Sequence, residues 1–143
     1  MADLLNTLGQ GVIHTIDIED KASELPKTHP RIKCFINGWA NYDLGLAKGF
    51  ERVLVIEDSS HNYQNTLGAI KRFAELVTKD SYLIVEDGII DELGLSNNFA
   101  GGPLKAIREF LPQHGEFRLE TKWGDLFGPS ATFNTGGYLK KIQ

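Results

Sequence analysis

The sequence lacks the residues and segments that would place it in several broad classes of protein. Its single cysteine, Cys34, cannot form an internal disulfide bond, so a reducing compartment is the expectation. No apolar run approaches the roughly 20 residues that cross a bilayer. The first residues, Met1 to Leu5, lack the basic region and the apolar stretch of a signal peptide. We therefore predict a cytoplasmic protein that has no membrane span.

The chain also lacks an excess of positive charge. Its 15 lysine and arginine residues are outnumbered by 19 aspartate and glutamate residues, which gives a net charge of -4. This balance offers no general attraction to nucleic acid or to anionic membranes, so we expect neither as a partner. No repeat, low-complexity tract or linker divides the 143 residues, and we predict a single domain over residues 1–143.

What the sequence does contain is an alternation of short apolar runs and segments with helical spacing. The expected strands cover residues 12–18, 32–36, 53–56 and 82–85, and the expected helices cover residues 2–8, 63–77 and 104–111. Residues 117–121 alternate between apolar and polar, and residues 131–133 and 138–142 flank the turn at 134–137. This order predicts an α/β fold with a mostly parallel sheet and an antiparallel C-terminal hairpin.

Carboxylates follow two of the expected strands. Asp58 comes just after the run 53–56, and Glu86 and Asp87 come directly after the run 82–85. Parallel strands end at one edge of a sheet, so these groups are expected to converge beside His61. Three carboxylates and an imidazole suit a divalent metal such as magnesium together with a general base. The alternative is a solvated acidic rim that caps the following segments, with His61 bonded to backbone or water.

Two further residues are candidates for contacts with a nucleotide-like cofactor. Asp17, at the end of the first expected strand, could accept hydrogen bonds from ribose hydroxyls. Its usual companion is a glycine-rich loop after an earlier strand, and the sequence has none, because Gly9 and Gly11 precede the first strand. Trp39, at the end of the next strand, could flank an adenine ring, although a packed tryptophan is the plainer interpretation.

Four separated motifs, at residues 58–63, 81–89, 102–111 and 132–139, resemble one known family. They look like the cephalosporin hydroxylase-like branch of the class I S-adenosylmethionine-dependent methyltransferases, which includes rhamnosyl and macrolide-sugar O-methyltransferases. The resemblance covers most of residues 10–142. It implies a Rossmann-like methyltransferase sheet and magnesium held by Asp58, Glu86 and Asp87. It also implies that His61 deprotonates a sugar hydroxyl and that Asp17 binds the ribose of the cofactor.

The chain departs from that family at its N-terminal end. Members carry a strand and a glycine-rich loop upstream of the point where this sequence begins, so we expect an N-terminally shortened domain that lacks the central strand. Unpaired strand edges invite pairing between chains, which predicts at least a dimer.

Three hypotheses remain from the sequence. The first is a magnesium- and S-adenosylmethionine-dependent O-methyltransferase acting on a sugar or another small-molecule hydroxyl. The second is a non-catalytic remnant that serves as a binding or oligomeric module. The third, an acidic receiver-like domain, fits the carboxylates but not the terminal hairpin. Whether this shortened chain is an active enzyme stays open at this stage.

Overall fold

The computed structural model describes residues 1–126, 128 and 132–143. The chain divides into two compact units, residues 1–43 and residues 44–143, and each contains both helices and strands. The α/β class predicted from the sequence is confirmed. No helix in the described part of the chain is long and apolar enough to cross a membrane.

The first unit is built on two parallel strands. Its elements in chain order are α1 (Ala2–Thr7), β1 (Ile13–Ile16), α2 (Glu24–Thr28), β2 (Ile32–Phe35) and the short 3-10 helix η1 (Trp39–Asn41). Ile13 pairs with Ile32 and Ile16 pairs with Phe35, so β1 and β2 end together. Both strands are shorter than the expected runs 12–18 and 32–36, although the Asp17 N–H still donates to the Phe35 carbonyl oxygen at 2.9 Å.

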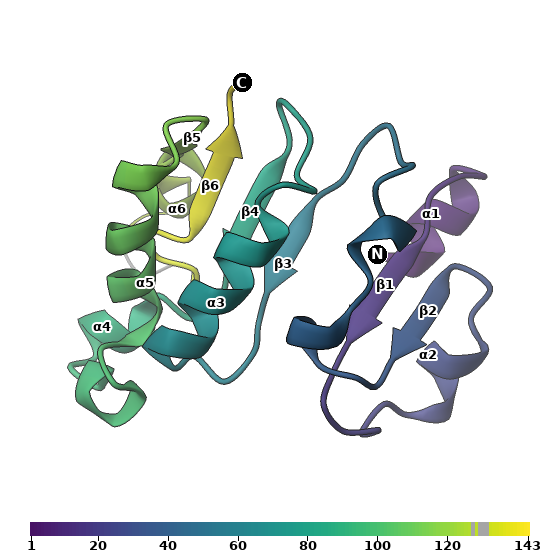
Figure 1. Ribbon diagram of the computed structural model, residues 1–143, viewed down its shortest axis with the longest axis horizontal. Coiled ribbons are helices and arrows are strands. Elements are labelled where there is room, and N and C mark those ends of the chain that lie inside the picture. Colours follow the sequence, from purple (N-terminus) through teal and green to yellow (C-terminus); the bar gives the residue numbers. More distant parts are fainter. Residues whose placement is uncertain (127, 129–131) are drawn as a thin grey trace. The chain divides into compact units, whose positions relative to one another are not determined.

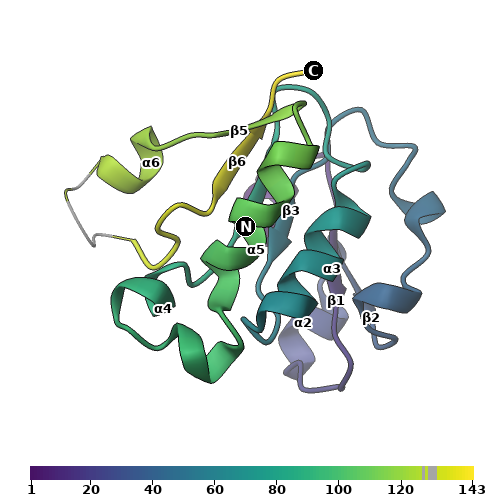
Figure 2. The same cartoon turned by 60° about the vertical axis from the view of Figure 1, so that its left-hand side comes forward.

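The second unit contains the larger sheet and two long helices. Its elements are η2 (Leu44–Leu46), β3 (Val55–Glu57), α3 (Tyr63–Phe73), β4 (Tyr82–Val85), α4 (Ile89–Glu92), η3 (Ser96–Phe99), α5 (Gly102–Phe110), η4 (Leu111–Gln113), β5 (Phe117–Leu119), α6 (Lys122–Asp125) and β6 (Tyr138–Lys141). Figures 1 and 2 show α3 and α5 side by side over one face of the sheet. The segment between β4 and α5 contains the short helices α4 and η3.

The sheet of the second unit is mixed rather than mostly parallel. Its strand order is β3-β4-β6-β5, in which β3 and β4 are parallel and the other two pairings are antiparallel. The antiparallel C-terminal pair is present, but β6 forms it with β5. The expected hairpin across residues 134–137 does not form from Thr132 and Phe133, and residue 131 lies outside the described residues. The reason is that β4 and β5 already occupy both edges of β6.

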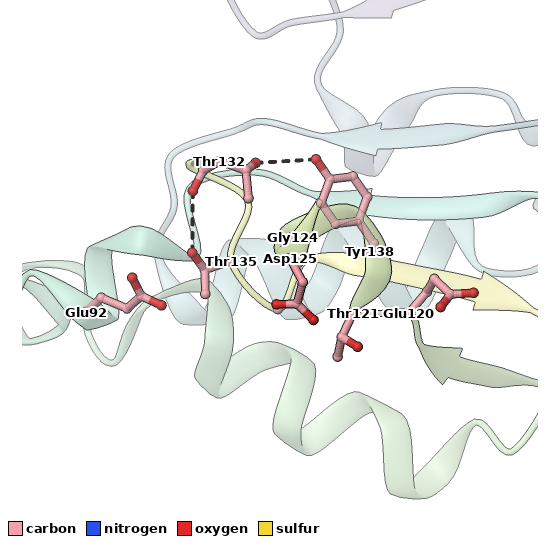
Figure 3. A pocket seen from close by; sticks show the side chains of 9 residues that line it. Glu92, Glu120, Thr121, Gly124, Asp125, Thr132, Thr135 and Tyr138 are labelled. Atoms are coloured by element: carbon pink, nitrogen blue, oxygen red, sulfur yellow. Dashed lines mark hydrogen bonds between the residues drawn. The ribbon is translucent and has the colours of Figure 1, made fainter. Parts of the chain in front are cut away.

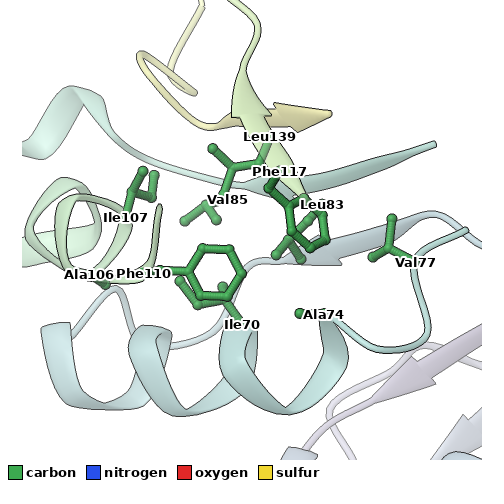
Figure 4. Close-up of a cluster of buried hydrophobic side chains, with 10 residues drawn as sticks. All are labelled: Ile70, Ala74, Val77, Leu83, Val85, Ala106, Ile107, Phe110, Phe117 and Leu139. Atoms are coloured by element: carbon green, nitrogen blue, oxygen red, sulfur yellow. The ribbon is translucent and has the colours of Figure 1, made fainter. Parts of the chain in front are cut away.

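A single apolar cluster fills the space between the sheet and the two helices (Figure 4). Its ten buried members are Ile70, Ala74, Val77, Leu83, Val85, Ala106, Ile107, Phe110, Phe117 and Leu139. Leu83 and Val85 are two residues apart on β4, so their side chains lie on the same face of the sheet. Ile70 and Ala74 are one helical turn apart near the end of α3, and their side chains contribute to the same core. Helix α3 ends at Phe73, yet buried positions continue to Val77 as expected from the helical spacing.

The N-terminus of α3 is fixed by a side-chain cap. The Asn62 side chain accepts a hydrogen bond from the Gln64 backbone N–H at 3.0 Å, which satisfies one of the free donors of the first turn. This cap directly follows His61, so the start of the helix also determines where the chain turns after β3.

We expect Leu83→Ala to destabilise the protein by about 2–5 kcal/mol, because it leaves a cavity at a position that is 0% exposed. Leu93→Ala is the matched control, since Leu93 is 63% exposed and its loss opens no cavity. Urea denaturation of both variants measures the difference. Equal destabilisation by the two substitutions would contradict this description of the core.

Candidate functional site

The parallel pairing of β3 and β4 brings the two acidic strand ends together. Glu57 pairs with Val85, and the Glu86 N–H donates to the Glu57 carbonyl oxygen at 2.9 Å, so both strands stop at the same level. Directly beyond them, carboxylate oxygens of Asp58 and Asp87 and a ring nitrogen of His61 lie within 4.8 Å of one another. The expected convergence of these three residues is therefore present. We call Asp58, His61, Glu86 and Asp87 the acidic cluster.

His61 is held in the cluster by its backbone and by two neighbours. Its Nε2 lies 3.2 Å from the Asp87 Oδ2, and its ring meets the Phe99 ring edge-on at 6.2 Å between centroids. The other ring nitrogen, Nδ1, is buried and has no hydrogen-bond partner among the described residues. The Asp87 carboxylate and the Phe99 ring therefore define the orientation of the imidazole.

Both partners of this pair adopt left-handed backbone conformations. The φ angles are 55° at His61 and 57° at Asp87. Such a conformation costs a residue with a Cβ about 1–2 kcal/mol. The packing around the strand ends holds the two residues there, and it thereby fixes where the imidazole and the carboxylate lie.

Glu86 lies beside these three groups, but it is not one of the residues whose ligand atoms cluster within 4.8 Å. Burial is the main cause that raises the pKa of Glu86, and the charges of Asp58 and Asp87 raise it further. A hydrogen bond from Asn134 and the nearby His61 act in the opposite direction. The three carboxylates therefore repel one another at this edge, which is the situation that a cation would relieve.

Asn134 is a site residue that the sequence interpretation missed. Its side-chain Oδ1 accepts from the Asp87 N–H at 3.4 Å, and its side chain also bonds to Glu86. The turn that carries it packs tightly on β4, where the Val85 N–H donates to the Gly137 carbonyl oxygen at 2.8 Å. The sequence marks residues 134–137 only as a turn. Only the pairing of β4 with β6 places this amide beside the acidic pair.

Glu57 is a second missed residue. It is 5% exposed, and its Oε1 accepts from both the N–H and the hydroxyl of Ser59. Its other carboxylate oxygen is buried without a hydrogen-bond partner in the described part of the chain. Glu57 thereby holds the loop that begins at Asp58. Its position at the end of an apolar run, directly before Asp58, was the available signal, since a carboxylate that becomes buried there needs a structural partner.

Asp17 and Trp39 lie together at one end of the first unit. The Gly38 N–H donates to the Asp17 carbonyl oxygen at 2.9 Å, which ties the start of η1 to the end of β1. The Asp17 Oδ1 accepts from the backbone N–H groups of Ile18 at 2.7 Å and Glu19 at 3.2 Å. The carboxylate is exposed and its orientation is fixed by this turn. The two residues predicted to contact a cofactor are thus neighbours within their own unit.

The donor set of the acidic cluster fits a divalent cation. Carboxylate oxygens are the ligands that magnesium prefers, and an imidazole nitrogen widens the choice to manganese and related metals. Burial beside two other carboxylates raises the pKa of Glu86, and the Nδ1 of His61 has no hydrogen-bond partner in the described part of the chain.

Comparison with known proteins identifies the family of the chain. Residues 42–142 match the family described as Rhamnosyl O-methyltransferase/CmcI. The chain belongs to this family. It is also 29% identical over 117 residues to a Rhamnosyl O-methyltransferase from Mycobacterium leprae (strain TN), an alignment that covers 81% of this chain and 48% of the relative. The chain therefore spans about half the length of that curated relative. The match to the Rhamnosyl O-methyltransferase/CmcI family includes every member of the acidic cluster and Asn134.

Glu86→Gln should stabilise the protein in chelator at neutral pH. The pKa of Glu86 is raised above its ordinary value, so the folded state favours the neutral carboxyl. The stability contributed by this group is present below its ordinary pKa and is lost as the pH rises through the raised value. Urea denaturation at pH 4 and pH 7 measures this, with the exposed Glu51→Gln as control. If the Glu86→Gln variant is no more stable than the wild type at pH 7, the raised pKa of Glu86 is contradicted.

Gly88→Ala should disturb the site through its backbone. A Cβ at Gly88 would lie 1.9 Å from the Thr135 carbonyl oxygen, so the turn that carries Asn134 must move. We expect a loss of about 1–3 kcal/mol of stability. Gly115→Ala is the matched control, because nothing lies within 4 Å of its Cβ position. The measurement is thermal unfolding, and equal melting temperatures for the two variants would refute the close approach.

Proposed function

We propose that this protein is an S-adenosylmethionine- and magnesium-dependent O-methyltransferase that acts on a hydroxyl of a sugar or a similar small molecule. The observation that carries the proposal is the convergence of Asp58, His61 and Asp87 beside Glu86, at the common end of β3 and β4, in a chain of the Rhamnosyl O-methyltransferase/CmcI family. A Rossmann-like class I methyltransferase domain that includes both units is part of the same proposal.

The roles within the acidic cluster follow from its chemistry. Asp58, Glu86 and Asp87 would hold the cation through their oxygens, with the amide of Asn134 keeping Glu86 in place. A divalent cation bound there lowers the pKa of an acceptor hydroxyl. His61 would take the hydroxyl proton on a ring nitrogen, since its ring is oriented by Asp87 and Phe99 beside the carboxylates.

Asp17 and Trp39 would contribute to binding the methyl donor. The Asp17 carboxylate is held by its own turn and is exposed, as a ligand for ribose hydroxyls must be. In the reaction, the acceptor oxygen forms a bond to the sulfonium methyl carbon, the carbon–sulfur bond breaks, and S-adenosylhomocysteine leaves. The proton of the acceptor hydroxyl passes to His61, so charge and atoms balance.

A second function, that of a non-catalytic binding or oligomeric module, is favoured by the edge of the larger sheet. Strand β3 is an edge strand of that sheet, and its Ile56 is 43% exposed, while Leu54 directly before the strand is 45% exposed. An apolar edge strand of this kind invites pairing with another chain, so we propose at least a dimer under either function. Light scattering that shows a monomer at high concentration would refute the dimer.

Calorimetric titration with Mg²⁺ or Mn²⁺, followed by S-adenosylmethionine, tests the proposed activity. We expect Asp58→Asn to weaken metal binding at least tenfold, whereas the exposed Asp80→Asn leaves it unchanged. His61→Gln should retain donor binding and lower methyl transfer by about 10²–10⁴-fold. Absence of donor binding at millimolar concentration, with the protein folded, would reject the enzyme and leave the binding module.

A further inference from the structure

Lys105, on the first turns of α5, contacts two other segments of the second unit. Its Nζ lies 4.0 Å from the centroid of the Tyr63 ring. A Cβ placed on Gly101 would lie 2.4 Å from the Lys105 Cδ and 3.3 Å from its Nζ, so the lysine stem packs directly against the Gly101 backbone. One side chain thus touches both an aromatic ring and a glycine. We call Tyr63, Gly101 and Lys105 the lysine clasp.

The lysine clasp joins the two segments that carry His61 and Phe99. Tyr63 is the first residue of α3 and lies two residues after His61. Gly101 lies two residues after Phe99 and directly before α5. The rings of His61 and Phe99 meet edge-on at 6.2 Å between centroids. The same two segments are therefore bridged twice, once by the aromatic contact at the acidic cluster and once by the lysine.

The Tyr63 ring, on which the lysine rests, is itself held in place. It packs against the apolar cluster under α3 and α5, and its hydroxyl donates to the Glu109 Oε2. The Lys71 Nζ lies 3.5 Å from the Glu109 Oε1. The bond from Tyr63 is the main cause that lowers the pKa of Glu109, and the charges of Lys71 and Lys105 act in the same direction. The ring is therefore a fixed support for the ammonium group.

The segment that carries Phe99 needs such a support, because its backbone is strained. Three consecutive residues have left-handed φ angles, 54° at Ala100, 113° at Gly101 and 71° at Gly102. Ala100 has a Cβ, so this conformation is unfavourable for it and persists only where the surroundings hold it. Glycine at position 101 meets two demands at once, since it adopts the positive φ and leaves room for the Lys105 stem.

We propose that Lys105 and Tyr63 are positioning residues for the imidazole of His61. The lysine clasp sets how the segment that carries Phe99 approaches the start of α3, and Phe99 in turn orients the His61 ring. Helix α5, which carries no member of the acidic cluster, thereby controls the orientation of the base. The inference rests on the proposed function, because a base must point at the acceptor hydroxyl to take its proton.

The lysine clasp is distinct from the cavity of the second unit. That cavity, of about 290 Å³, is lined by residues of α4, of α6 and of the chain that leads into β6 (Figure 3). None of the three clasp residues is among them. Substitutions in the clasp therefore leave the lining of the cavity unchanged, and their effects report on the contact between His61 and Phe99.

The first test measures the nuclear Overhauser effect between the His61 and Phe99 ring protons, in chelator and without a methyl donor. We expect Lys105→Met to lower it by about half or more, because the cation–π contact is lost while the unbranched stem remains. Lys105→Arg keeps a cation over the ring and should retain the effect. Lys79→Met removes the same charge from an exposed position outside the clasp and should leave it unchanged. Lys105 is exposed, so all three variants should fold.

The second test separates positioning from a general loss of structure. We expect Lys105→Met to lower kcat for methyl transfer about tenfold, with the KM for S-adenosylmethionine unchanged, because only the geometry of the base is affected. Lys105→Arg should restore kcat.

An Overhauser effect that Lys105→Met leaves intact overturns the inference, and so does an equal loss in Lys79→Met. A lowered effect in a protein that transfers no methyl group would sustain the lysine clasp while refuting the proposed activity. A lowered effect with full kcat would refute the positioning role.

Discussion

The parallel pairing of β3 with β4 is the constraint on which the candidate site depends. It stops two strands at one level, so that the carboxylates of Asp58 and Asp87 and the imidazole of His61 lie close together, with Glu86 beside them. The pairing is in turn held by the core, because Leu83 and Val85 project from β4 into the apolar cluster under α3 and α5. The stability of the fold therefore offsets an arrangement of like charges that is unfavourable in isolation.

The supports of the cluster come from three different segments. Glu57 fixes the loop after β3, Asn134 reaches across from the turn before β6, and Phe99 approaches from η3. None of these residues is close in sequence to both acidic strand ends. The antiparallel addition of β6 to β4 is what brings Asn134 into reach, so the mixed character of the sheet has a direct chemical role.

Periodicity and composition predicted the elements that are fixed by local rules. The apolar spacing from Leu67 to Phe73 identified α3, and the run at residues 82–85 matched β4 at both ends. The convergence of Asp58, His61 and Asp87 followed from topology alone. The antiparallel partner of β6 did not follow from the sequence. Residues 131–133 have a pattern that suits a strand as well as that of residues 117–119 does, and only the competition for the two edges of β6 decides between them. Asn134 was out of reach for the same reason, since its contacts with Glu86 and Asp87 are non-local. Glu57 bonds locally to Ser59, and its place at the end of an apolar run was a signal that the sequence interpretation did not use.

The left-handed backbone at His61 and Asp87 has a consequence for how such a chain can change over time. Glycine or asparagine at either position would relieve the backbone strain, so selection for stability alone favours the loss of the imidazole and of the carboxylate. A chain that no longer needs the chemistry of this site gains folding stability when these two residues are replaced. The presence of both His61 and Asp87 therefore indicates that the chemistry of this site is needed. The presence of Asp58, which is exposed and has no strained backbone, does not indicate this.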